Sequence, residues 1–440
     1  MSDHPAHGPD DAGDDRPPHP FAGTPFEALF AQFGAAGQAP GAGQMPDLNA
    51  LMGQMQRLFT PHEGTINAEV TRDVARQTCA AAGADLSVTA AQQAAVADAA
   101  QLAEMWLDHA TDLTRSATTA AAWSRAEWIE HTASTWRSLA EPVAEHVVAA
   151  MGEAMPPEVK AMAGPLLGML SSAGGAMFSQ QLGRGLGELA GEVLCSTDIG
   201  LPLGPAGVAA VLPENLTAFG EGLERTPTDM LLYVVLRECA HHRLFAAAPW
   251  LRPALVGAVE EYGRGTRIDM QAVESRLSGF DPSDPQQIAT ALQNGLFDPE
   301  PTEQQRQALA RLEHLLALVE GWVDEVVTQA AHERMPAAAA LAEAMRRRRA
   351  TGGPAEQTFA SLVGLQLRPR RLRDAANLWA AVRDRCGAAA RDDLWLHPDV
   401  LPTPTDLDDP LGFADRSESG ADEGSDDAFD AELRRLLDEQ

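Results

Sequence analysis

The residues best suited to chemistry lie in the stretch Thr226–Leu244, which reads TPTDMLLYVVLRECAHHRL. A largely apolar run is interrupted there by Arg237, Glu238, His241 and His242. Residues four apart in a helix lie one turn above each other, so Arg237 lies over His241. This is the spacing of H-E-x-x-H, in which two histidines bind zinc and the glutamate activates a water molecule. The motif is degenerate here, because it reads R-E-C-A-H.

The flanking sequence predicts how this stretch is positioned. Thr226 and Asp229 form a start of the capping-box type, and Pro227 stands at the first helical position, where its missing N–H costs nothing. The short apolar run Gly207–Leu212 before it predicts a strand. A strand, a loop and a capped helix follow each other in zincin-type sites, where an edge strand runs beside the metal-binding helix.

A zincin needs three protein ligands, an open position for water and a carboxylate that acts as general base. His241 can supply one ligand and Glu238 the base. The best candidate for a third ligand is Glu320, in the apolar sequence LVEGWVD. An unpaired carboxylate is costly in such surroundings. We therefore expect a cation beside it, either a metal ion or Arg237.

Several segments together resemble a known family. They read LRECAHHRLFAAAPWL, LVEGWVD, RRRRATGGPAEQTFASLVGLQLRPRRLRDAANLW and RDDLWLHPDVLP. In this order they are similar to a family of bacterial zincin-like hydrolases, also described as zinc-dependent metalloproteases. A sister branch of that family is associated with deazaflavin-coenzyme biosynthesis. The resemblance covers roughly residues 25–410.

The resemblance implies a zinc cofactor and a role for each matching residue. His241 and Glu320 would be metal ligands, Glu238 the general base, and Asp324 a group behind Glu320. The departure is Arg237, whose guanidinium is always charged and has no lone pair for zinc. Arg237 could instead take the place of the metal and pair with Glu320.

Other assignments of these residues remain open. His241 could equally be a core or interface residue instead of a ligand. Glu238 could equally form an ion pair with Arg237 or Arg243 instead of acting as a base. His242 favours a packing or surface role. Further ligands could come from His242, His314, His332 or Asp324, and Glu260 and Glu261 are a weaker alternative to Glu320. The E-x-x-H spacing of di-iron bundles occurs only at Glu238 and His241, and no G-x-S-x-G elbow or phosphate-binding loop is present.

Composition excludes several function classes. The net charge is −30 and a single lysine, Lys160, is present, which argues against nucleic acid as a partner. The arginine run at 346–349 favours a solvated helix end or internal ion pairing. No apolar run is long enough for a membrane span. The four cysteines form no C-x-x-C pair and no signal peptide begins the chain, so we expect a cytoplasmic protein with free thiols.

The periodicity predicts a mainly α fold with a minor β element, that is, a zincin-like helical domain over residues 25–402. Helices are expected throughout residues 68–150, including 117–138, and again over 303–333, 337–349 and 371–389. Residues 1–24 and the acidic tail 403–440 are expected to be disordered, since they cannot bury enough apolar surface.

Two functions follow from this sequence. The first is a metallopeptidase-type hydrolase in which zinc-bound water attacks a carbonyl with Glu238 as base. The second is a catalytically inactive relative in which Arg237 replaces the metal and the groove binds a peptide or protein.

Overall fold

The structure, a computed structural model, describes residues 64–153, 164–265, 302–350 and 371–423. These residues belong to one compact unit, Leu58–Asp269 with Pro299–Gln440. The predicted disorder of residues 1–24 lies outside the described residues.

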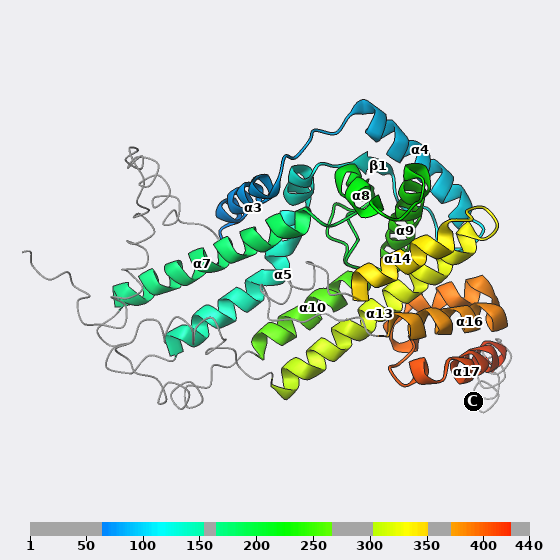
Figure 1. Cartoon of the computed structure of the whole chain (residues 1–440). Helices are drawn as coiled ribbons and strands as arrows, with labels where there is room; N and C mark the ends of the chain where they lie inside the picture. Colours follow the sequence, from blue (N-terminus) through cyan, green and yellow to red (C-terminus); the bar gives the residue numbers. More distant parts are fainter. Residues whose placement is uncertain (1–63, 154–163, 266–301, 351–370, 424–440) are drawn as a thin grey trace, which may run out of the picture. The chain divides into compact units, whose positions relative to one another are not determined.

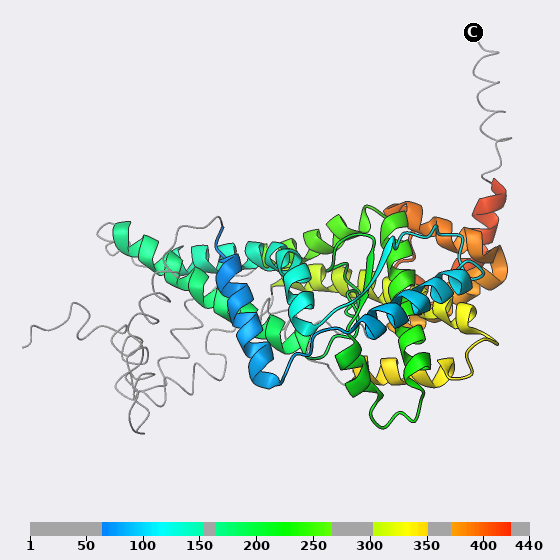
Figure 2. The same ribbon diagram turned by 90° about the horizontal axis from the view of Figure 1, so that it is seen from above.

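The described unit is mainly α-helical, as the periodicity predicted (Figures 1 and 2). Its helices and strands follow each other in this order: α3 (Ala68–Ala82), α4 (Ala90–Leu107), β1 (Thr119–Ala122), α5 (Arg125–Glu153), α7 (Gly164–Ala190), β2 (Val208–Val211), α8 (Pro213–Gly220), α9 (Pro227–Ala247), α10 (Leu251–Arg264), α13 (Glu303–Ala331), α14 (Ala338–Ala350), α16 (Leu372–Asp393) and α17 (Pro410–Glu423). None of these helices combines the length and the apolar character that crossing a membrane requires.

The minor β element is a two-stranded parallel sheet. The strand predicted over 207–212 is present as β2, and its partner β1 pairs Thr119 with Val208 and Ala122 with Val211. The prediction of continuous helix over 117–138 is wrong at 119–122. The alanine-rich sequence TAAA favours a helix locally, but pairing with a strand almost ninety residues away decides its conformation.

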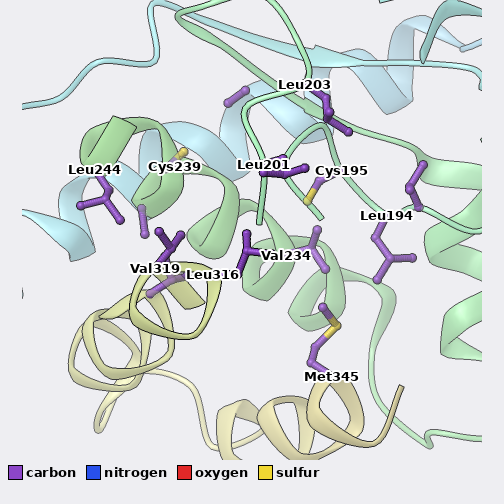
Figure 3. Close-up of a cluster of buried hydrophobic side chains, with 14 of the residues drawn as sticks. Leu194, Cys195, Leu201, Leu203, Val234, Cys239, Leu244, Leu316, Val319 and Met345 are labelled. Carbon is purple, nitrogen blue, oxygen red and sulfur yellow. The ribbon is translucent and has the colours of Figure 1, made fainter. Parts of the chain in front are cut away.

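The R-E-x-x-H sequence lies on α9, which is packed on several sides. α9 packs against β2, α4, α13 and α14. Figure 3 shows the apolar side chains at this junction, including Val234 of α9, Leu316 and Val319 of α13, and Met345 of α14. All four are nearly inaccessible to solvent. The charged residues of α9 therefore lie in dry surroundings.

The predicted disorder of the acidic tail is wrong for its first part. A short 3-10 turn, Asp406–Asp408, precedes α17, and α17 packs against α16. Leu407 and Ala414 are buried. Arg371, the residue just before α16, pairs with Asp408, and Arg385 of α16 pairs with Asp415. Arginines of a neighbouring helix compensate the acidic charge, which composition alone could not reveal. Residues 424–440 lie outside the described part of the chain.

α13 and α16 approach each other closely at Gly321, the residue after Glu320. A Cβ on Gly321 would lie 2.6 Å from Ala375 Cβ and 2.7 Å from Ala376 N, closer than side chains can approach. We expect Gly321→Ala to force the two helices apart and to lower the free energy of unfolding by about 2 kcal/mol. Urea denaturation monitored by circular dichroism measures this.

The matched control for this prediction is Gly257→Ala in α10, where a Cβ meets nothing within 4 Å. Alanine there removes only the backbone freedom of glycine, so the free energy of unfolding should rise by up to about 1 kcal/mol. Equal effects of the two substitutions would contradict the close approach at Gly321.

Candidate functional site: a buried arginine, histidine and glutamate cluster

α9 begins as the sequence predicted and carries charge into the core. The Thr226 hydroxyl accepts the N–H of Asp229 at 3.0 Å, and Pro227 opens the helix. Further along, Arg237, Glu238 and His241 are at most 4% exposed. Charged groups at such depth are stable only when they are paired or hydrogen-bonded, so each must have partners within the fold.

Arg237 and His241 meet on Glu320 of α13. Arg237 Nη2 lies 2.5 Å from Glu320 Oε2, and His241 Nε2 lies 3.1 Å from Glu320 Oε1. Arg237 Nη1 also lies 3.6 Å from Asp324 Oδ1, one turn along α13. The structure thus brings together four of the residues singled out in the sequence, and the ion pair proposed as the alternative to a metal is present.

A second source of positive charge at this carboxylate is α14. Arg349 forms an ion pair with Glu320 Oε2, and Arg346 Nη1 lies 3.4 Å from Asp324 Oδ2. Burial alone would raise the pKa of Glu320, but the charges of Arg349, His241 and Arg237 outweigh it and hold the pKa well below its usual range. Glu320 is therefore a carboxylate held by two arginines and a histidine.

Both ring nitrogens of His241 face oxygen atoms of the protein. Its Nδ1 lies 2.8 Å from the carbonyl oxygen of Arg237, and its Nε2 lies 3.1 Å from Glu320 Oε1. A metal ion at Nε2 would have to displace the contact with Glu320.

Glu238 faces different partners from its neighbour Arg237. Its Oε2 accepts the hydroxyl of Thr197 at 2.5 Å and the N–H of Thr197 at 3.1 Å. Its Oε1 accepts the hydroxyl of Ser196 and the N–H of Ala210 in β2 at 3.2 Å. The carboxylate thus joins α9 to β2 and to the segment before it. A water molecule could reach it only by displacing one of these donors.

The environment of Glu238 fixes its charge. Burial alone would raise its pKa, but His242, whose Nε2 lies 3.4 Å from Oε1, and the hydroxyls of Ser196 and Thr197 lower the pKa to about 2. A strong acid of this kind is a poor acceptor of a proton near neutral pH.

Gly200 lies directly over the carboxylate of Glu320. Its φ of +78° belongs to the left-handed region, and a Cβ there would lie 2.9 Å from Glu320 Oε1. Sequence reasoning did not single out Gly200, Ser196 or Thr197, and the one available signal was the turn-forming sequence around them. It did anticipate internal ion pairing of the arginine run 346–349, but not the identity of the partners.

The other sequence candidates do not join this cluster. His314 Nε2 bonds to the carbonyl of Pro402 at 2.8 Å, and His332 is exposed beyond the end of α13. Glu260 and Glu261 pair with Arg264 and Arg311. Arg243, a possible partner of Glu238, instead binds Glu104 of α4, with Nε 2.9 Å from Oε2.

The residues around Glu320 do not fit a zinc ion. Its oxygens are engaged by two arginines and a histidine, and the guanidinium of Arg237 cannot be a ligand. Within the described ranges, no group of three or more His, Cys, Asp or Glu side chains is arranged to hold a metal. Asp324, the other carboxylate nearby, is itself paired with Arg237 and Arg346. The cluster therefore does not present the three free protein ligands of a catalytic zinc site.

The depressed pKa of Glu238 predicts a pH dependence of stability. A carboxyl whose pKa falls from 4.5 to about 2 on folding contributes about 3 kcal/mol above pH 5, and this contribution is lost as the pH falls toward 2. Glu238→Gln removes it. We therefore expect the gap in unfolding free energy between wild type and this variant to narrow by about 2 kcal/mol from pH 6 to pH 3.

Urea titrations at each pH measure this gap. Replacement of the exposed residue Glu221 by Gln is the control and should leave a small gap with little pH dependence. A pH-independent gap for Glu238→Gln would contradict the depressed pKa.

Comparison with known proteins gives one family match and one structural match. The sequence pattern of the zincin-like metallopeptidase family matches residues 66–414. No curated protein matches the chain. One solved structure shares the fold: a Chloroflexus aurantiacus protein, reported as a "putative hydrolase with a novel fold", is 19% identical, has a TM-score of 0.57, and its match covers 80% of this chain and 98% of its own. The match over most of the chain identifies the family: this protein belongs to the zincin-like metallopeptidases.

Proposed function

We propose that this protein is a zincin-like family member in which Arg237 takes the place of the catalytic metal, and that it acts by binding a peptide or protein instead of hydrolysing one. The observation that carries the proposal is the convergence of Arg237 and His241 on the buried carboxylate of Glu320. In this arrangement the first ligand position of the motif holds a permanent cation. The second holds His241, whose Nε2 lies 3.1 Å from Glu320 Oε1.

The state of Glu238 supports the same conclusion. A general base must lie within hydrogen-bond reach of the attacking water and have a pKa near the working pH. Glu238 has a pKa of about 2, is fully buried and accepts hydrogen bonds from Ser196, Thr197 and Ala210. We infer that it keeps a structural role between α9 and β2.

The second candidate function is the hydrolysis that the family description implies, favoured by the match over residues 66–414. It would use His241 and Glu320 as zinc ligands and Glu238 as base. It requires Arg237 and Arg349 to leave Glu320 and a further ligand to enter. The two candidates therefore differ in whether the purified protein takes up zinc.

We place either activity in the cytoplasm. The cysteines in the described residues are free thiols, and three of the four are buried. Reduced thiols of this kind suit a reducing compartment. The net charge of −30 favours partners other than nucleic acid.

Zinc uptake tests the proposal. The untagged wild-type protein, dialysed against micromolar zinc and then against buffer, should retain far less than one zinc per chain by elemental analysis. Arg237→His removes the cation and restores an H-E-x-x-H frame, so this variant should retain more zinc than wild type. Arg225→His, at an exposed position, controls for an added histidine.

Two results would decide for the hydrolase. One is close to one zinc per wild-type chain. The other is peptidase activity of the wild-type protein that a chelator abolishes and zinc restores.

A further inference from the structure

The arginine run of α14 reaches three carboxylates outside its own helix. Arg346 Nη1 lies 3.4 Å from Asp324 Oδ2, Arg348 Nη1 lies 2.8 Å from Asp198 Oδ2, and Arg349 pairs with Glu320. Asp324 and Glu320 belong to α13, and Asp198 lies in the segment before β2. We call Asp198, Glu320 and Asp324 the carboxylate cluster.

Arg348 and Arg349 also contact backbone carbonyl groups. Arg348 Nη2 donates to the carbonyl of Glu192 at 2.6 Å, and Arg349 Nη2 donates to the carbonyl of Asp198 at 2.8 Å. Guanidinium groups bind carboxylates and carbonyl oxygens with several directed donors, which makes the contact specific for arginine. The end of α14 is therefore held by a set of hydrogen-bonded ion pairs.

The apolar contribution of α14 is small by comparison. Among its residues 338–349, whose burial the structure describes, the buried apolar ones are Leu341, Ala342 and Met345. Met345 extends from α14 toward the α9 side chains around Val234 (Figure 3). Most of the rest of the helix is partly or fully exposed. Charge pairing thus contributes a large share of the attachment.

The carboxylate cluster has an excess of negative charge without α14. Glu320 and Asp324 then keep the single permanent positive charge of Arg237, and Asp198 loses its ion pair with Arg348, so the negative charges outnumber the permanent positive charge. One oxygen of Asp198, Oδ1, is buried without a hydrogen-bond partner even with α14 in place. A buried, undercompensated carboxylate group favours a cationic occupant.

We propose that α14 is a displaceable intramolecular occupant of this cluster, and that the cluster is a binding site for an arginine-bearing helical peptide segment. This inference rests on the proposed binding function, because a metal at Glu320 would supply the missing charge itself. The partner is a helix whose arginines reach Asp198 and Glu320. The site opens when α14 detaches.

The test uses the full chain and a labelled peptide of the α14 sequence, AAALAEAMRRRRA. Arg348→Gln/Arg349→Gln weakens the intramolecular contact. The matched control is Arg347→Gln, since the Arg347 side chain is 77% exposed and pairs with Glu343 of the same helix. Hydrogen exchange followed by mass spectrometry reports the opening of α14, and fluorescence anisotropy reports peptide binding.

In the double variant we expect the amides of α14 to exchange at least about tenfold faster, with α9 and α13 unchanged. The peptide should bind this variant, more weakly at high salt, and should bind wild type and Arg347→Gln at least about tenfold more weakly. A peptide with glutamine at positions 348 and 349 should not bind. Unchanged exchange in a folded double variant, or equal binding of the two peptides, would overturn the proposal.

A second variant covers the case in which the double variant does not fold. Leu341→Ala/Met345→Ala loosens the apolar contact and keeps every charge, so it should show the same faster exchange and peptide binding. If it shows neither, the proposal is wrong. Zinc uptake by wild type with no peptide binding would count against the proposed function as well, whereas absence of both zinc and peptide binding would count against the displaceable helix alone.

Discussion

The arrangement around Glu320 depends on the cost of burying a carboxylate. Its side chain is 2% exposed, and a charge at that depth is stable only beside compensating charge. Arg237 supplies it from α9 and Arg349 supplies it from α14, and His241 of α9 adds a hydrogen bond. Because these three side chains come from two helices, the carboxylate fixes the position of both helices against α13. A zinc ion would satisfy the same electrostatic need with fewer protein charges.

α9 presents two different faces to the core. Arg237 and His241 lie one turn apart and face α13, whereas Glu238 and His242, each one position further on, face β2 and the segment before it. The residue that would be the general base in a hydrolase thus holds Ser196, Thr197 and Ala210 in place. We infer that the fold would retain this glutamate after loss of hydrolysis, because its removal would leave several buried donors unpaired.

The elements that the sequence predicts correctly are those with local signals. The start of α9 follows from Thr226 and Pro227, β2 from a short apolar run, and α13 from its periodicity. The expectation of a cation beside Glu320 also followed from sequence, since a carboxylate in an apolar helix must be compensated. β1 and α17 were missed because their stability comes from partners distant in the chain, namely β2 for one and α16 for the other.

The sequence by itself determined that a degenerate R-E-x-x-H frame lies on a capped, buried helix, and that Arg237 cannot act as a metal ligand. These conclusions need only helix periodicity and the chemistry of a guanidinium. The tertiary structure alone decided that Arg349 shares Glu320 with Arg237, and that Glu238 is hydrogen-bonded to Thr197 and Ala210. Those contacts join residues separated by tens of positions, and no local pattern specifies which of several carboxylates an arginine will reach.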